Sequence, residues 1–191
     1  MLLRMKTGLV ILAIVLLVGM SWIAFNSEKV ISQGRIHVHK PVVFPKNTPE
    51  LQKHTLVFFG FVGCTSVCTP RMKEIADIYT GFTQKSDKKN LSVLFINLKS
   101  SISTKEADTY AKAFHPAFSG VTFEPKDLLT TLRMFQAYYA YSLIDSTQIE
   151  HTQFLYFVHK DTQNNFYLNN IYTHAPFNVE LVINDLIKDF E

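Results

Sequence analysis

The sequence is poor in cysteine, and the two cysteines that it has stand close together. Cys64 and Cys68 are the only cysteines among 191 residues. A secreted scaffold held together by disulfides would carry more of them, so that class is excluded. A single close pair indicates redox or metal chemistry instead. In an oxidising compartment such a pair closes to a disulfide unless something keeps it reduced.

The sequence also has little excess of charge of either sign. The formal net charge is +3, and Arg4 and Lys6 contribute two of these charges before the first apolar segment. The rest of the chain is close to neutral and has no basic stripe, so nucleic-acid binding has no electrostatic support. The sequence also lacks a phosphate-binding loop, a serine in a nucleophile-elbow context and a pair of carboxylates for acid–base catalysis. The enzyme classes that depend on these motifs therefore find no support.

A long apolar run occurs once, near the N-terminus. Residues 8–25 are 18 consecutive uncharged positions that follow Arg4 and Lys6. This length suffices to cross a hydrocarbon core of about 30 Å, and the preceding positive charges favour a cytoplasmic N-terminus. We therefore expect residues 1–7 in the cytoplasm, residues 8–25 as an uncleaved transmembrane signal-anchor, and the remainder outside. The alternative is a cleaved signal peptide, for which residues 19–21 are the candidate site.

The remainder is expected to form a tether and one domain. Residues 26–51 are polar and contain three prolines, which predicts a tether and an irregular lead-in strand around residues 37–44. Residues 52–191 form the expected domain. Apolar runs rich in β-formers predict strands at 55–61, 91–97, 153–159 and 166–172. Apolar residues at helical spacing predict helices at 70–82, 104–114, 125–139 and 178–190, the second with a capping box between Ser103 and Glu106.

This order of elements predicts the fold class. Strands that alternate with helices form a mostly parallel sheet covered on both faces. The final pair of strands adds an antiparallel edge, because a short turn joins them. The sequence therefore predicts an α/β thioredoxin-like fold with an inserted helix, behind an N-terminal transmembrane helix.

The two cysteines stand where a strand gives way to a helix. Residues four apart at a helix start face the same side, at a separation close to what a disulfide can span. The helix N-terminus favours thiolate over thiol, which predicts a lowered pKa for at least one of the two cysteines. Thiolates are soft ligands that select Cu(I), and a third, nitrogen ligand would complete a site that also holds Cu(II). A structural disulfide and a pair of inert thiols are the alternatives.

The residues around the cysteines resemble a known family. Residues 58–68 read FFGFVGCTSVC, which is similar to the signature YFGFTxCPDxCP of the Sco (SCO1/SenC) proteins, a thioredoxin-like family that binds copper. The resemblance continues through residues 91–97 and 110–123. It extends to Glu150-His151-Thr152 before an apolar strand, where the family's copper-binding histidine stands.

The resemblance implies Cys64, Cys68 and His151 as ligands of copper, as Cu(I) and Cu(II). It also implies that the two cysteines are a redox-active pair able to form a disulfide. Thr65 and Thr69 stand where the family has prolines. Ser66 replaces an aspartate, and residues 99–104 lack the family's carboxylates. None of these departures removes a ligand.

The function that the resemblance implies is that of a copper metallochaperone. Its partners would be a copper donor or a thiol reductant, and a respiratory cytochrome c oxidase subunit that carries a copper centre. It would act on the outer face of a bacterial inner membrane, with one membrane span and the C-terminal domain in the periplasm. The alternative is a membrane-anchored thiol–disulfide oxidoreductase that uses Cys64 and Cys68. His151 discriminates between them, because disulfide exchange needs only the cysteines.

Six other histidines are interpreted as residues outside the copper site: His37, His39, His54, His115, His159 and His174. The first two alternate on the expected lead-in strand and are interpreted as solvated, although such a pair could bind metal weakly. The other four have no spaced partner and are interpreted as surface or turn residues. Met72 lies four residues after Cys68 and is interpreted as core, as are Phe58, Phe59 and Phe61.

Overall fold

The computed structural model describes residues 14–21, 34–86, 90–141 and 149–190, and the chain divides into two compact units, Met1–Arg35 and Ile36–Glu191. In the first unit, residues 14–21 are helical. Among the described residues, no helix combines the length and the apolar character needed to cross a membrane. The described residues do not include the expected segment 1–7, residues 8–13 and 22–25 of the expected span, or residues 26–33 of the tether.

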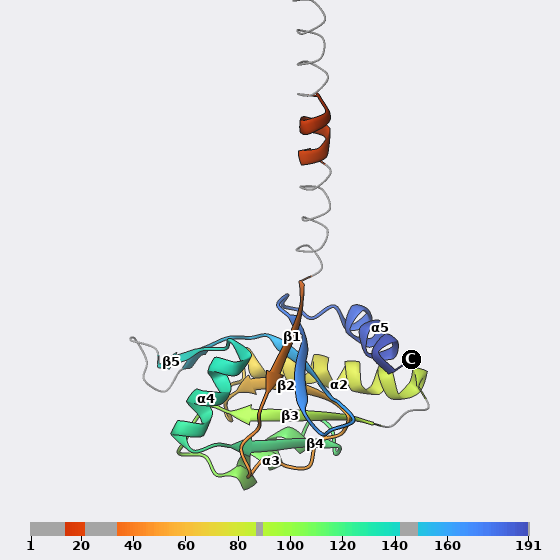
Figure 1. The fold of residues 1–191 in the computed structure, drawn as a ribbon. Coiled ribbons are helices and arrows are strands. Elements are labelled where there is room, and N and C mark those ends of the chain that lie inside the picture. Colours follow the sequence, from red (N-terminus) through yellow and green to blue (C-terminus); the bar gives the residue numbers. More distant parts are fainter. Residues whose placement is uncertain (1–13, 22–33, 87–89, 142–148, 191) are drawn as a thin grey trace, which may run out of the picture. The chain divides into compact units, whose positions relative to one another are not determined.

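A six-stranded sheet forms the centre of the second unit (Figure 1). In spatial order its strands are β1 (Arg35–Val42), β8 (Phe166–Tyr172), β7 (Leu155–Lys160), β2 (His54–Gly60), β3 (Leu91–Asn97) and β4 (Phe118–Thr122). The strands β2, β3 and β4 are parallel, and β7 is antiparallel to both β2 and β8. All seven residues of β2 are buried, as the unbroken apolar run predicts for a central strand.

Helices cover both faces of this sheet. They are α2 (Cys68–Lys85), α3 (Thr104–Lys112), α4 (Pro125–Phe135) and α5 (Val179–Phe190). On one face, Phe95 contacts Tyr110 of α3, and α2 packs against α5. On the other face, Phe135 of α4 contacts Phe59 and Tyr156. The predicted helices on both faces of the sheet are confirmed. The sheet itself is mixed rather than mostly parallel, because the parallel pairs β2–β3 and β3–β4 are matched by the antiparallel pairs β2–β7 and β7–β8.

The structure adds strands that the sequence pattern did not predict. The expected pair of successive helices is interrupted by β4, which pairs with β3. This strand has only five residues and contains Gly120, which weakens its apolar pattern. The glycine is required by packing, because a Cβ there would overlap the backbone carbonyl of Ala107 in α3. A second, two-stranded sheet joins β5 (Tyr139–Tyr141) and β6 (Ile149–His151).

Several element boundaries differ from the predicted ones. Helix α4 ends at Phe135 rather than residue 139, because Gln136 takes a left-handed conformation with φ 56°. Helix α2 begins at Cys68, two residues before the expected start, which leaves Pro70 in its first turn. The predicted capping box between Ser103 and Glu106 is confirmed at the start of α3.

Candidate metal centre

The two cysteines organise the first turn of α2. The carbonyl oxygen of Cys64 accepts hydrogen bonds from the N–H and the hydroxyl of Thr69, at 3.3 and 3.0 Å. Its Sγ accepts the N–H of Cys68 at 3.3 Å. The N-cap residue Val67 offers no side-chain hydrogen bond. Cys64 therefore supplies the acceptors that the exposed N–H groups of a helix start require, and Cys68 is the first residue of the helix.

Two glycines allow the chain to pass this point. Gly60 ends β2 beneath the helix start, and a Cβ there would lie 2.9 Å from Cys68 Sγ and 3.0 Å from Phe95 Cε2. Gly63, directly before Cys64, has a φ of 92°, which side chains of L-residues rarely adopt. The close approach at Gly60 and the turn at Gly63 together place the two sulfurs at the end of the sheet.

Asn97, the last residue of β3, fixes the same loop from the neighbouring strand. Its side chain is fully buried. Its Oδ1 accepts the N–H of Val62 at 3.2 Å. Its Nδ2 donates to the carbonyl of Lys99 at 2.7 Å and to the Thr122 hydroxyl at 2.9 Å. One buried amide therefore ties the cysteine loop to the ends of β3 and β4.

His151 reaches the cysteines from the two-stranded sheet. It ends β6 and pairs with Tyr139 of β5. Its Nδ1 lies 2.9 Å from the carbonyl oxygen of Thr152. A carbonyl can only accept, so Nδ1 carries the proton and Nε2 has the lone pair. This Nε2 lies 3.5 Å from Cys68 Sγ. Such a backbone partner on one ring nitrogen is how proteins orient a histidine that binds metal through the other.

The three side chains are shielded from water. The exposed fractions are 6% for Cys64, 0% for Cys68 and 8% for His151. The rings of Phe58 and Phe61 stand edge-on to the imidazole, with centroids 6.4 and 6.0 Å from it. The predicted core positions of Phe58, Phe59, Phe61 and Met72 are confirmed, since all four are buried. The aromatic rings therefore help to exclude water from the sulfur of Cys68 and the imidazole of His151.

Burial controls the protonation of this site. It raises the pKa of the Cys68 thiol far above its usual range, and the neighbouring Cys64 adds to the rise. The lowering expected at a helix N-terminus is therefore not seen in the pKa of Cys68, because the loss of solvent outweighs the hydrogen bonds that favour a thiolate. Burial also lowers the pKa of His151, although the bond to the Thr152 carbonyl opposes it. The site thus presents a neutral thiol and a neutral imidazole at neutral pH.

A pocket of about 370 Å³ opens beside the site. Cys64 and His151 line it, together with Tyr138 and Glu150. Cys68 has no exposed surface and lies behind them. A ligand or partner group therefore reaches the site from the side of Cys64 and His151.

The structure brings together the three residues that the sequence resemblance singled out. Cys68 contacts both others, through its amide to Cys64 and through its sulfur to His151. Both cysteines are free. Sequence reasoning missed Gly60 and Asn97 as positioning residues. The motif contained Gly60, and Asn97 was a polar residue at the end of an apolar strand, which is a usable signal.

The interpretation of two histidines as surface or turn residues without a partner is wrong. His54 is fully buried at the start of β2, and its Nε2 lies 3.2 Å from His159 Nδ1 of β7. Strand pairing brings them together, since His54 and His159 are direct partners in the β2–β7 register. The interpretation of His174 as a surface residue is confirmed.

Comparison with known proteins identifies the family. A model of the SCO1/SenC family matches residues 48–181, which is more than half of the chain. The chain belongs to the SCO1/SenC family. The human mitochondrial protein SCO1 homolog is 25% identical over 163 residues, covering 76% of this chain and 54% of the human protein. The chain therefore spans about half the length of this relative.

Solved structures agree with this assignment at the level of the fold. Copper-bound ScoI from Arabidopsis thaliana superposes with a TM-score of 0.63 at 19% identity, over 81% of this chain and 98% of the other. BsSco, described as having a disulfide switch and as a member of the Sco family of cytochrome c oxidase assembly proteins, superposes with a TM-score of 0.52 at 14% identity. That match covers 71% of this chain and 79% of BsSco. The thioredoxin-like Sco fold predicted from the sequence is confirmed.

Proposed function

We propose that this protein is a copper metallochaperone that binds copper through Cys64, Cys68 and His151. The observation that carries the proposal is the 3.5 Å approach of His151 Nε2 to Cys68 Sγ, with Nδ1 held by a backbone carbonyl. Two sulfurs and one imidazole are a donor set that suits copper in both oxidation states, because soft thiolates favour Cu(I) and imidazole suits Cu(II). Family membership and the copper-bound relative support the same assignment.

The environment suits a cargo that must be held and then released. A buried thiol that keeps its proton becomes a ligand only when a metal ion displaces that proton. The neutral imidazole needs no such exchange, since its Nε2 lone pair is already available. Cys64 and His151 face the pocket, so a partner's ligands have access to two of the three donors. This arrangement favours transfer between proteins over permanent retention.

The partner that we propose is a copper-containing subunit of a respiratory cytochrome c oxidase. The description of BsSco as a member of a family of cytochrome c oxidase assembly proteins supports this choice. We further propose that the domain acts outside the cytoplasmic membrane of a bacterium, attached by residues 8–25. Support comes from Arg4 and Lys6 before the apolar run and from the helical residues 14–21, whose large apolar side chains are exposed.

The metal-binding test compares two oxidation states in the reduced full-length chain. Cu(I) is satisfied by two soft ligands, so His151→Ala is expected to keep most Cu(I) binding. The same variant is expected to lose the thiolate-to-Cu(II) charge-transfer band. Cys64→Ser and Cys68→Ser are each expected to lose both. His174→Ala, which removes an exposed histidine, is the matched control and should leave both signals intact.

One result would reject the assignment of His151 as a ligand, and another would reject the copper proposal. An unchanged Cu(II) spectrum in His151→Ala would mean that another nitrogen completes the site. A reduced wild-type chain that binds no copper but readily reduces disulfides would establish the thiol–disulfide oxidoreductase instead.

The membrane proposal has its own test, a C-terminal fusion to a reporter that is active only after export. An inactive fusion, or a mature N-terminus near Trp22, would contradict the anchored topology.

A further inference from the structure

A second group of metal-ligating side chains lies at the other end of the sheet. In the part of the chain that the structure describes, His54, His159 and Asp189 form a set of three whose ligand atoms all lie within 4.8 Å of one another. His54 begins β2, whereas the cysteines follow the end of that strand. A seven-residue strand spans about 20 Å. This cluster is therefore separate from the candidate copper site.

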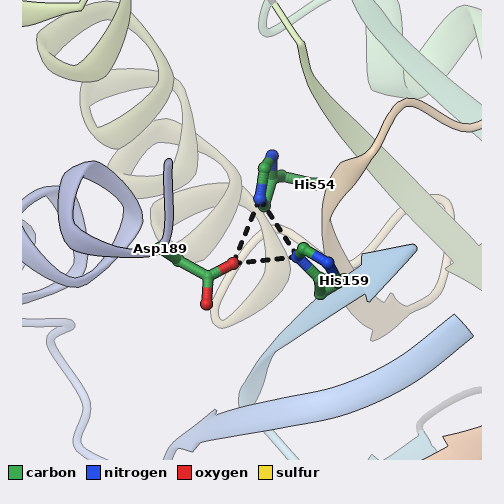
Figure 2. Close-up of side chains that lie close together, drawn as sticks. All are labelled: His54, His159 and Asp189. Atoms are coloured by element: carbon green, nitrogen blue, oxygen red, sulfur yellow. Dashed lines mark hydrogen bonds and ion pairs between the residues drawn. The ribbon is translucent and has the colours of Figure 1, made fainter. Parts of the chain in front are cut away.

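Three atoms converge on one point in this cluster (Figure 2). Asp189 Oδ2 lies 3.1 Å from His54 Nε2 and 3.0 Å from His159 Nδ1. The two ring nitrogens lie 3.2 Å from each other. Figure 2 shows that the residues come from different elements, with Asp189 on α5 and the histidines on neighbouring strands.

Hydrogen bonding alone accounts poorly for this triangle. An ionised carboxylate only accepts, so each imidazole must direct an N–H at Asp189 to make its bond. Two ring nitrogens that both carry protons then face each other at 3.2 Å without an acceptor between them. A cation at the centre removes this conflict, because all three atoms can then direct lone pairs at it.

The spacing is close to that of a tetrahedral metal site. Zinc–ligand bonds of about 2.0–2.1 Å place neighbouring donor atoms about 3.3 Å apart in a tetrahedron. The observed separations of 3.0 to 3.2 Å differ from this by small side-chain shifts. Two imidazoles and one carboxylate suit Zn²⁺ and the neighbouring divalent transition metals, whereas Ca²⁺ and Mg²⁺ prefer oxygen ligands.

The cluster is supported on one side and accessible on the other. His54 is fully buried and its ring stacks on Phe157, so this ligand is held rigidly. The side chains of His159 and Asp189 are 24% and 29% exposed. Both line a pocket of about 410 Å³, together with His39 and Asn169. A metal ion therefore has a route to the three donors and room for water as a fourth ligand.

We propose that His54, His159 and Asp189 bind a divalent transition-metal ion of the Zn²⁺ type, which links the end of α5 to β2 and β7. An ion bound there joins strands that pair in the sheet to the last helix of the chain. Metal binding to the folded state alone stabilises that state. The site is therefore structural, and it is independent of the proposed copper function.

The test uses the full-length chain carrying Cys64→Ser and Cys68→Ser, so that no thiolate competes for the probe ion. Titration of this protein with ZnCl₂ is expected to give one Zn²⁺ per chain and a rise of Tm with Zn²⁺ concentration. Adding His159→Ala or Asp189→Asn is expected to weaken binding by about 100-fold or more and to abolish the rise. His174→Ala is the matched control, because it removes an exposed histidine and should change neither result. Co²⁺ as a second probe should give the visible absorption of a four-coordinate nitrogen and oxygen site.

The contrary results are equally specific. If the parent protein binds no Zn²⁺ up to millimolar concentration, the cluster is a hydrogen-bonded network only and the proposal fails. If His159→Ala and Asp189→Asn bind as tightly as the parent, the ion lies elsewhere and the proposal also fails. Asp189→Asn keeps the shape of the side chain, so its loss of binding in a variant with unchanged circular dichroism cannot come from misfolding. A failure of this metal-site proposal would not bear on the copper proposal, because the copper spectra report on the cysteine site alone.

Discussion

Cys68 Sγ lies 3.5 Å from His151 Nε2, although 83 positions separate the two residues in the sequence. The sulfur is held by the first turn of α2, and the imidazole by the end of β6. No local sequence feature connects these elements. The distance between the two donor atoms therefore depends on the packing beneath α2 and on the loop that leads into this helix. Substitutions in the packing and in the loop test this dependence.

Gly60→Ala tests the packing beneath the sulfur. The new methyl group would lie 2.9 Å from Cys68 Sγ, so the sulfur or the helix has to move. We expect a loss of about 1–3 kcal/mol in the free energy of unfolding, as for other overpacked cores. A weaker Cu(II) charge-transfer band should accompany it. Urea denaturation and copper titration measure the two effects.

Gly63→Ala is the comparison for that experiment. Nothing lies within 4 Å of a Cβ at Gly63, but its φ of 92° strains any other residue. We expect a loss of about 1–2 kcal/mol from backbone strain, with no direct displacement of Cys68. Equal copper spectra in both variants would contradict the claim that Gly60 positions the sulfur.

Asn97→Ala tests the anchor of the cysteine loop. The substitution leaves the Val62 N–H and the Lys99 carbonyl without the Asn97 amide and also removes the bond to Thr122. We expect a loss of about 3 kcal/mol in the free energy of unfolding, because three hydrogen bonds of about 1 kcal/mol each are removed. The Lys99 carbonyl still accepts the N–H of Ile102 at 3.1 Å. Thr122→Val removes one of the three bonds and should cost about 1 kcal/mol. Similar losses in the two variants would show that Asn97 does not act as the shared anchor.

The capping box of α3 predicts a pH dependence. Hydrogen bonds from the Ser103 hydroxyl and N–H lower the pKa of Glu106. A carboxyl whose pKa is depressed on folding stabilises the folded state above its unfolded pKa, and this contribution disappears as pH falls through the folded value. Glu106→Gln should therefore be less stable than the wild type at pH 7, and the difference should narrow toward pH 3. Glu124→Gln, at an exposed carboxyl without such bonds, is the control in denaturant titrations at both pH values.

The buried thiol predicts the opposite pH dependence. Burial raises the pKa of Cys68, so folding favours the protonated thiol. Its contribution is present below the unfolded pKa of about 8.5 and is lost as pH rises above that value. In the reduced protein, the wild type should lose more stability between pH 7 and pH 10 than Cys68→Ser does. An equal loss in both proteins would indicate that Cys68 ionises as readily in the folded chain as in the unfolded one.

The sequence by itself determined the local elements and the chemistry of the first site. The unbroken apolar run of β2, the spacing of apolar residues in α2 and the capping residues of α3 are short-range signals, and all were predictable. The cysteine spacing indicated redox or metal chemistry. The resemblance to a family then singled out His151, which spacing alone could not do.

Only the tertiary structure decided which distant residues meet and how their environment changes them. The short strand β4 was missed because Gly120 interrupts its pattern, and the glycine is explained only by the carbonyl of Ala107 that lies against it. The pKa of the Cys68 thiol is raised although a helix terminus favours the thiolate, since a local rule about helix termini cannot account for burial by the rest of the chain. His54, His159 and Asp189 have no common sequence pattern, and strand register and helix docking bring them together. Solvent exclusion and long-range contacts are properties of the folded chain, and they set the character of both sites.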